Sequence, residues 1–195
     1  MRRIFNPQKE MGYRFMVWGF KIMDLFGKPD RRLNDFDIMQ GSVVVDYGCG
    51  PGRYIQKASE LVGPAGRVYA VDISRMAIDI VRKKIEDNNL DNVVPVLLGD
   101  GSPEIEDHCA DIVYALDMFH QIEDPVAFLA DIYRITKKDG IFFLEDGHQS
   151  RKKMKTKIAR SGCWRIDKEN PRHIRLVPVE TCGGINNRRM EKEES

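Results

Sequence analysis

A short apolar run that breaks off into three closely spaced glycines constrains this chain more than any other feature. The run is VVVDYGCGPG, residues 43–52, in which three valines precede Asp46 and the glycines stand at positions 48, 50 and 52. Consecutive β-branched residues favour a strand covered on both faces. Glycines allow a tight turn whose bare backbone can approach a ligand closely. The segment therefore predicts a buried strand that ends at a ligand-binding turn.

Further apolar runs alternate with amphipathic segments up to residue 145. The predicted strands are 43–47, 67–71, 93–98, 111–116 and 140–145, and the predicted helices are 53–62, 74–88 and 124–136. Ser74 is placed to cap its helix, and Pro125 stands at a helix start. Alternation at this spacing predicts an α/β fold with a parallel sheet that has helices on both faces.

The final part of the chain has a different pattern. A basic helix is expected over 149–161, and the short strands 163–168 and 173–179 flank the turn-rich KENPR. Two strands this close together predict an antiparallel hairpin at the sheet edge. We expect three parts: an N-terminal helical lid or packing segment over 1–40, a main domain over 41–180, and a frayed tail over 181–195.

Composition limits the class of protein. A chain of 195 residues with 42% hydrophobic content can bury a core. The four cysteines lie far apart without metal-ligand spacing, so we expect no metal site and no disulfide framework. Neither a signal peptide nor an apolar run of roughly 18 residues is recognisable, which predicts a cytoplasmic protein without a transmembrane segment.

Charge is distributed unevenly along the chain. The overall net charge is +1, but residues 41–150 carry 10 basic and 19 acidic side chains, and residues 151–195 carry 13 basic and 6 acidic ones. A basic segment of this kind is either a solvated helix face or a surface for a polyanion. The sequence leaves both readings open.

Acidic residues stand at the ends of successive predicted strands. Asp46 precedes the glycine turn, Asp72 ends the second strand and Asp100 follows the third. A carboxylate at the second position can hold ribose hydroxyls, and a buried acid calls for a cationic partner. The glycine spacing also differs from the G-x-G-x-x-G of dinucleotide binders, which disfavours a nicotinamide-dependent oxidoreductase. The pattern favours a ligand with an ammonium group, a ribose and an adenine.

Over roughly residues 40–179 the chain resembles the class I S-adenosylmethionine-dependent methyltransferases, closest to the small-molecule branch that includes quinone-ring C-methyltransferases. The resemblance rests on VVVDYGCGPG, VYAVDISRMAIDIVRKK, LLGDGSP, DIVYALDMFHQIEDPVAFLADIYRITKKDG and FFLED. It implies a Rossmann-like, seven-stranded, mostly parallel sheet with an antiparallel last strand. It also implies S-adenosylmethionine as the methyl donor and S-adenosylhomocysteine as the product.

The resemblance assigns donor-binding roles by position. Asp46 would bind the methionine ammonium group, and Asp72 would bind the ribose diol. Ile73 would pack on the adenine, and the Leu116 carbonyl would face the ammonium group. The remaining donor-binding positions are Gly48, Gly50 and Gly52 along the methionine and ribose, and Asp100 with Gly101 at the adenine amine.

Catalytic residues are not identified by these motifs. His120 in MFHQ, His148 in EDGH and Asp117 are candidates for a general base or for contact with the acceptor, because their loops should open on the acceptor side. The apolar segment 9–27 could form a lid over the acceptor, a packing helix, a homodimer contact or a membrane-surface helix.

The sequence therefore predicts a methyltransferase that acts by in-line displacement on a small, partly apolar acceptor. Nucleic acid is disfavoured as the acceptor, because LDMFHQ lacks the NPPY-type sequence of amino-methylating DNA enzymes and no Pro-Cys pair follows. The alternative is a non-catalytic protein that binds S-adenosylmethionine as a sensor or scaffold. The acceptor, the accepting atom and the oligomeric state are left open.

Overall fold

The computed structural model describes residues 29–99 and 105–182. These two stretches form two compact units, called the N-terminal unit and the C-terminal unit. The strand order is β3-β2-β1-β4-β5-β7-β6 in a seven-stranded sheet, which confirms the predicted α/β, Rossmann-like fold. The segment 9–27 and most of the predicted tail lie outside the described residues. No described helix is long and apolar enough to cross a membrane.

The N-terminal unit is a three-stranded parallel half-sheet. Parallel pairing joins β1 to β2, with Val44 opposite Val68, and β2 to β3, with Val68 opposite Val93. Val44 and Val45 of β1 are fully buried, as the apolar run predicted, whereas Val43 is half-buried. In chain order the elements are η2 (Pro29–Phe36), β1 (Val43–Tyr47), α2 (Ile55–Val62), β2 (Arg67–Asp72), α3 (Arg75–Asn88) and β3 (Val93–Leu97).

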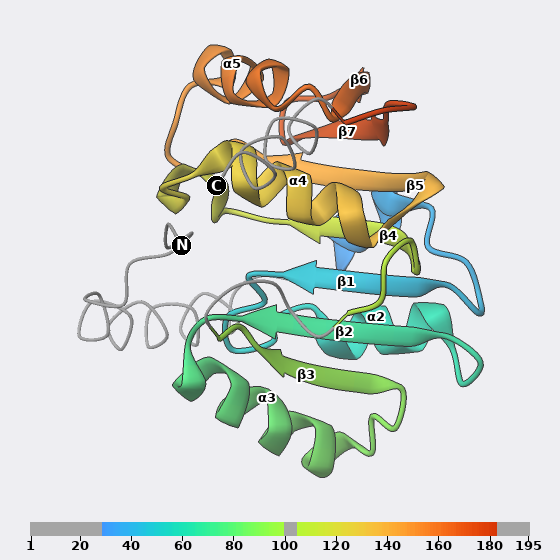
Figure 1. The fold of residues 1–195 in the computed structure, drawn as a ribbon. Helices are drawn as coiled ribbons and strands as arrows, with labels where there is room; N and C mark the ends of the chain where they lie inside the picture. Colours follow the sequence, from blue (N-terminus) through green and yellow to red (C-terminus); the bar gives the residue numbers. More distant parts are fainter. Residues whose placement is uncertain (1–28, 100–104, 183–195) are drawn as a thin grey trace, which may run out of the picture. The chain divides into compact units, whose positions relative to one another are not determined.

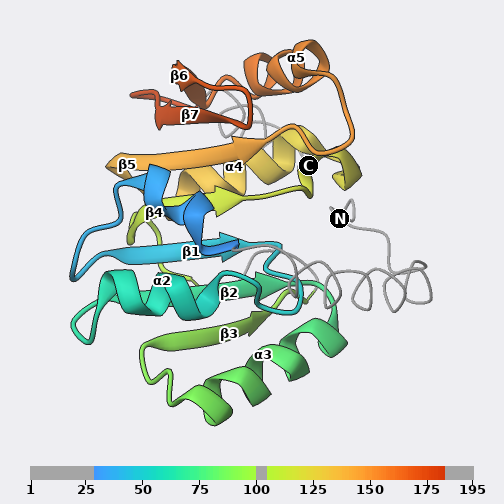
Figure 2. The same ribbon diagram turned by 180° about the vertical axis from the view of Figure 1, so that it is seen from behind.

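The helices of this unit begin and end where local chemistry dictates. The Ser74 side chain accepts a hydrogen bond from the Ala77 N–H at 3.3 Å, which confirms the predicted cap of α3. The left-handed Asn89 ends the same helix. Helix α2 lies behind β1 and β2 in Figure 1 and in front of them in Figure 2, and it buries Ile55, Ala58 and Val62.

The C-terminal unit combines a parallel strand pair with the predicted hairpin. Strand β5 runs parallel to β4, and β7 runs antiparallel to both β5 and β6. Helix α4 lies in front of β4 and β5 in Figure 1. In chain order the elements are β4 (Ala110–Ala115), η3 (Phe119–Gln121), α4 (Pro125–Ile135), β5 (Thr136–Glu145), α5 (Arg151–Ser161), β6 (Trp164–Glu169) and β7 (His173–Pro178).

Strand β5 starts four residues earlier than the apolar pattern predicted. Thr136 directly follows α4 and pairs with Ala110, and regular pairing resumes at Ile141 after an irregularity. At Gly140 a Cβ atom would lie 2.9 Å from the Ala110 carbonyl oxygen, so only glycine permits this approach of the two strands. The sequence did not predict this early start, because the first residues of β5 are polar and lack the apolar pattern of a strand.

Aromatic side chains build the core of the C-terminal unit. The ring of Phe142 lies 5.2 Å from that of Trp164 and 6.4 Å from that of Phe128, measured between centroids. The Trp164 indole N–H donates to the Leu129 carbonyl at 2.9 Å. This bond satisfies the one polar group of a buried indole, and it ties β6 to α4.

Two cysteines of this unit form a disulfide, so the prediction of no disulfide was wrong. Cys163 precedes β6 and Cys182 follows β7, and their Cα atoms lie 4.1 Å apart. The hairpin brings the two ends together, and the Val179 N–H donates to the Cys163 carbonyl at 3.0 Å. A separation of 19 residues gave no sign of this pairing, because only the antiparallel register creates it.

Candidate functional site

The glycine turn of the N-terminal unit follows β1 directly. Gly48 and Gly50 have φ angles of 80° and 54°, which side-chain-bearing residues rarely adopt. The N–H groups of Gly48 and Cys49 donate to the Val71 carbonyl at 2.8 and 3.0 Å. At Gly52, also left-handed, a Cβ atom would lie 2.8 Å from Ile55 Cδ1. The turn is therefore built from backbone and is fixed to the end of β2.

Asp72 locks this turn. Its Oδ2 accepts from the Gly50 N–H and its Oδ1 from the Ser74 N–H, both at 2.8 Å. The side chain is 6% exposed, and burial raises its pKa, while hydrogen bonds from Ser74, Gly50 and Ile73 oppose that shift. A carboxylate has about four acceptor sites. Asp72 can therefore hold the turn and still accept from ligand hydroxyl groups.

The turn carries negative charge. Asp46 lies inside β1 and is 2% exposed, and Asp72 lies at the end of the neighbouring strand β2. The pKa of the Cys49 thiol is raised well above its usual value by burial first and then by the charges of Asp46 and Asp72. The Lys84 ammonium group, which donates to the Gly52 carbonyl at 3.0 Å, lowers it in part. Two buried carboxylates beside the turn favour a cationic ligand over a pyrophosphate.

An exposed apolar side chain follows Asp72. Ile73 is 39% exposed, and among the described residues only Met39 is another exposed large hydrophobic residue. Nothing lies within 4 Å of a Cβ placed on Gly99, which follows the end of β3. A flat apolar ligand group could lie on Ile73. The assigned partners Asp100 and Gly101 lie outside the described residues.

The C-terminal unit brings the three catalytic candidates together. The His148 Nε2 lies 3.9 Å from the Asp117 Oδ1, and the rings of His148 and His120 meet edge to face with centroids 4.9 Å apart. The three residues come from the loop after β4, from η3 and from the loop after β5. We call Asp117, His120 and His148 the histidine cluster. Leu116, assigned to the donor ammonium group, is buried just before Asp117.

Backbone conformation holds the histidine cluster in place. Asp117 is a non-glycine residue with a φ of 54°, a conformation that costs energy and that often marks functional positions. Gly147 has a φ of 60°, and a Cβ atom there would collide with the His120 Nδ1. Gly147 therefore allows the loop after β5 to lie directly against the His120 ring.

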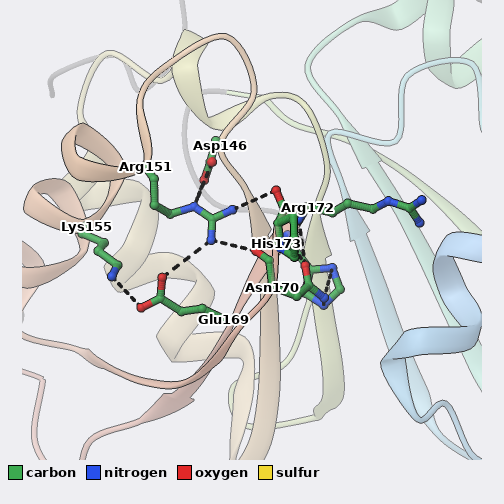
Figure 3. A network of polar contacts seen from close by, with 8 residues as sticks. Asp146, Arg151, Lys155, Glu169, Asn170, Arg172 and His173 are labelled. Atoms are coloured by element: carbon green, nitrogen blue, oxygen red, sulfur yellow. Dashed lines mark hydrogen bonds and ion pairs between the residues drawn. The ribbon is translucent and has the colours of Figure 1, made fainter.

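An arginine missed by the sequence analysis anchors the same loop. Arg151, the first residue of α5, donates from Nε to Asp146 Oδ2 at 2.8 Å and from Nη1 to the Asn170 carbonyl at 3.0 Å. Figure 3 shows this network, in which Glu169 also pairs with Lys155. In the sequence Arg151 is only part of a basic run, because its hydrogen-bond partners lie up to 20 residues away. Its effect is to tie the loop after β5 to the β6–β7 turn.

Comparison with known proteins gives the family. The family model described as "Methyltransferase domain" matches residues 45–144, which is about half of the chain. That range includes most of β1, the glycine turn, Asp72, the loop after β4 and most of β5. It ends before His148 and Arg151.

Curated relatives act on different acceptors by name. The chain is 31% identical over 119 residues to the ribosomal RNA large subunit methyltransferase E of Natronomonas pharaonis, a match that covers 58% of the chain and 44% of that protein. It is 30% identical over 104 residues to the demethylmenaquinone methyltransferase of Lactobacillus johnsonii, covering 53% and 43%. The chain thus spans less than half the length of these relatives.

Solved structures share the fold. A S-adenosylmethionine-dependent methyltransferase from Aquifex aeolicus matches with a TM-score of 0.70 at 20% identity, covering 78% of this chain and 90% of that one. A TehB-like methyltransferase from Corynebacterium glutamicum matches with a TM-score of 0.67 at 16% identity, covering 89% and 100%. At these identities the similarity establishes the fold alone.

Proposed function

The chain belongs to the methyltransferase domain family, and on that premise we propose that it transfers the methyl group of S-adenosylmethionine to an acceptor by in-line displacement. The donor carries a sulfonium leaving group, so the protein's main task is to align the methyl carbon with the acceptor atom. Positioning of this kind supplies up to about 7–11 kcal/mol of the barrier in favourable cases. The methyltransferase family expected from the sequence is confirmed, and the quinone C-methyltransferase branch and the residue roles stay predictions.

The negative glycine turn is the observation that carries the proposal. S-adenosylmethionine is cationic at its sulfonium and ammonium groups. Asp46 and Asp72 are both buried and both act on the Cys49 thiol, so they favour such a ligand. A pyrophosphate would be repelled at the same place. In the proposal Asp46 binds the ammonium group, Asp72 the ribose diol and Ile73 the adenine face.

For the acceptor we propose a small, partly apolar molecule. The absence of NPPY-type sequence after β4 supports this, as does the match to an enzyme named for demethylmenaquinone. The relative named for ribosomal RNA makes RNA the competing acceptor. Exposed Lys152, Lys153 and Arg160 on α5 would then contact phosphates, and RNA binding would fall steeply with salt.

Calorimetry and a product assay test the proposal. We expect S-adenosylmethionine and S-adenosylhomocysteine to bind and NAD not to bind. With a metabolite panel and a separate ribosomal RNA sample, release of S-adenosylhomocysteine identifies the acceptor class. Absence of donor binding at millimolar concentration would refute the proposal. Tight binding without any product in either sample would instead favour the non-catalytic sensor or scaffold.

A further inference from the structure

We propose that His148, oriented by Asp117 and supported by His120, accepts the proton that the methyl acceptor loses. The inference rests on the proposed function and narrows it. The acceptor is then a molecule whose attacking atom carries a proton, such as a phenol or enol O–H or an amine N–H. A thioether or selenide acceptor, which has no proton to lose, would not need this residue.

The position of the cluster supports a role toward a ligand. Strands β4 and β5 are parallel neighbours, with Ala115 opposite Leu144. Asp117 and His148 each follow the carboxyl end of one of these strands, and ligands of open α/β sheets bind outside the carboxyl ends. His148 is 81% exposed, so its ring is accessible to a ligand.

The loop that carries His148 is held at several points although its histidine is exposed. Gly147 lies directly against the His120 ring. Asp146 pairs with Arg151, whose guanidinium group also donates to the carbonyls of Asn170 and Pro171. An exposed loop histidine without a role does not need such support. Catalytic groups do, because small displacements cost large factors in rate.

The position of Asp117 distinguishes the two ring nitrogens of His148. Nε2 is the atom nearest Asp117, at 3.9 Å from Oδ1. The carboxylate therefore favours the tautomer with the proton on Nε2 and leaves Nδ1 as the acceptor, which is the logic of a base oriented by a third group. Hydrogen bonds at catalytic sites are often long before the substrate binds and then shorten.

The step balances in atoms and charge. The lone pair of the acceptor atom forms the bond to the methyl carbon, and the carbon–sulfur bond breaks with its electron pair moving to sulfur. The acceptor's proton passes to Nδ1 of His148. The positive charge of the sulfonium thus ends on the imidazolium, beside the Asp117 carboxylate. No oxidant, reductant or metal takes part.

Kinetics of matched variants test the proton transfer. Catechol and tyramine serve as proton-bearing acceptors, and dimethyl selenide as a proton-free one, at saturating S-adenosylmethionine. We expect His148→Ala to lower turnover of the proton-bearing acceptors by about 10²–10⁴-fold, the range of general-base catalysis, and added imidazole to restore part of it. Dimethyl selenide turnover and the calorimetric donor Kd should not change. His108→Asn, an exposed histidine before β4, is the control and should match the wild type.

A second measurement tests the role of Asp117 without any acceptor. Nitrogen NMR of the neutral His148 ring should place its proton on Nε2 in the wild type, and Asp117→Asn should move part of it to Nδ1. An unchanged tautomer would overturn the positioning role.

Full turnover of proton-bearing acceptors by His148→Ala would refute the role of His148 as a general base. The same role would be refuted if the wild type methylated dimethyl selenide but none of the proton-bearing acceptors. Failure of the wild type to bind S-adenosylmethionine would instead refute the proposed function itself. Donor binding with no acceptor methylated by the wild type would overturn this inference, while the panel and RNA assays still decide the broader function.

Discussion

The candidate sites of the two units are built from different parts of the chain. In the N-terminal unit the turn is made of backbone: glycine φ angles, N–H groups that bond to the Val71 carbonyl, and a carboxylate that accepts from two further N–H groups. In the C-terminal unit the histidine cluster consists of side chains from separate loops, held by Gly147 and Arg151. A site built from backbone can be recognised from one short sequence motif. A site built from side chains that are distant in the sequence cannot be recognised in this way.

The same contrast extends to stability. Short strands of valines and alanines make the buried sheet of the N-terminal unit, while phenylalanines and Trp164 fill the core of the C-terminal unit. The disulfide adds a covalent link only in the latter. Substitutions should therefore affect the two units through different mechanisms.

The largest effect is expected from Phe142→Ala. The ring is fully buried between Phe128 and Trp164, so its removal leaves a cavity and should lower the free energy of unfolding by about 3–5 kcal/mol. Urea denaturation measures the change. Met39→Ala in the N-terminal unit is the control, because Met39 is exposed and its loss should stay within about 0.5 kcal/mol. Equal values for the two variants would contradict the aromatic core.

Reduction of the disulfide should come next. Opening a link across 19 residues should cost about 3 kcal/mol in the chain-entropy account. Urea denaturation of Cys163→Ser/Cys182→Ser against the wild type gives the value, and Cys109→Ser, outside the disulfide, is the control. If peptide mapping without reductant recovered Cys163 and Cys182 on separate peptides, the pairing would be disproved.

Asp72→Ala should affect both stability and ligand binding. The substitution leaves the N–H groups of Gly50 and Ser74 without their acceptor, at a cost of about 1–3 kcal/mol. The sequence assigned Asp72 only to the ribose diol, whereas the structure adds a role in stability. Loss of the ribose contact should weaken S-adenosylmethionine binding about 10- to 100-fold, equivalent to about 1.4–2.8 kcal/mol.

Asp79→Ala is the matched control for Asp72. Asp79 lies on α3 of the same unit in an exposed pair with Arg82, and such pairs contribute little. Donor affinity in calorimetry should equal that of the wild type. If Asp72→Ala behaved like Asp79→Ala in both assays, neither the lock on the turn nor the ribose role would stand.

The smallest effects are expected from removing a serine N-cap in each unit. Ser74 caps α3 and Ser150 caps α5, each accepting from the third helical N–H at 3.3 Å. Because the Ser74 bond is partly buried and the Ser150 bond is exposed, Ser74→Ala should cost about 1 kcal/mol and Ser150→Ala about 0.5 kcal/mol. Thermal unfolding of both variants gives the ranking. A larger loss at Ser150 would show that burial does not decide the strength of these caps.

Much of the fold followed from the sequence. The pattern predicted β1 at its observed bounds, the cap at Ser74, the start of α4 near Pro125 and the antiparallel hairpin. These features depend on neighbours in the chain: side-chain branching, a capping oxygen, a fixed proline φ angle. The start of β5 was missed because Lys137, Lys138 and Asp139 do not resemble a strand, and pairing with β4 overrides local preference.

For the site, the sequence by itself determined the glycine turn and the residues beside it, since backbone conformation depends on the residue that adopts it. It also singled out Asp117, His120 and His148 as isolated candidates. Only the tertiary structure decided that these three meet, that Arg151 holds their loop and that Cys163 pairs with Cys182. Those contacts join residues far apart in the chain, and the register of parallel and antiparallel strands sets the distances between them.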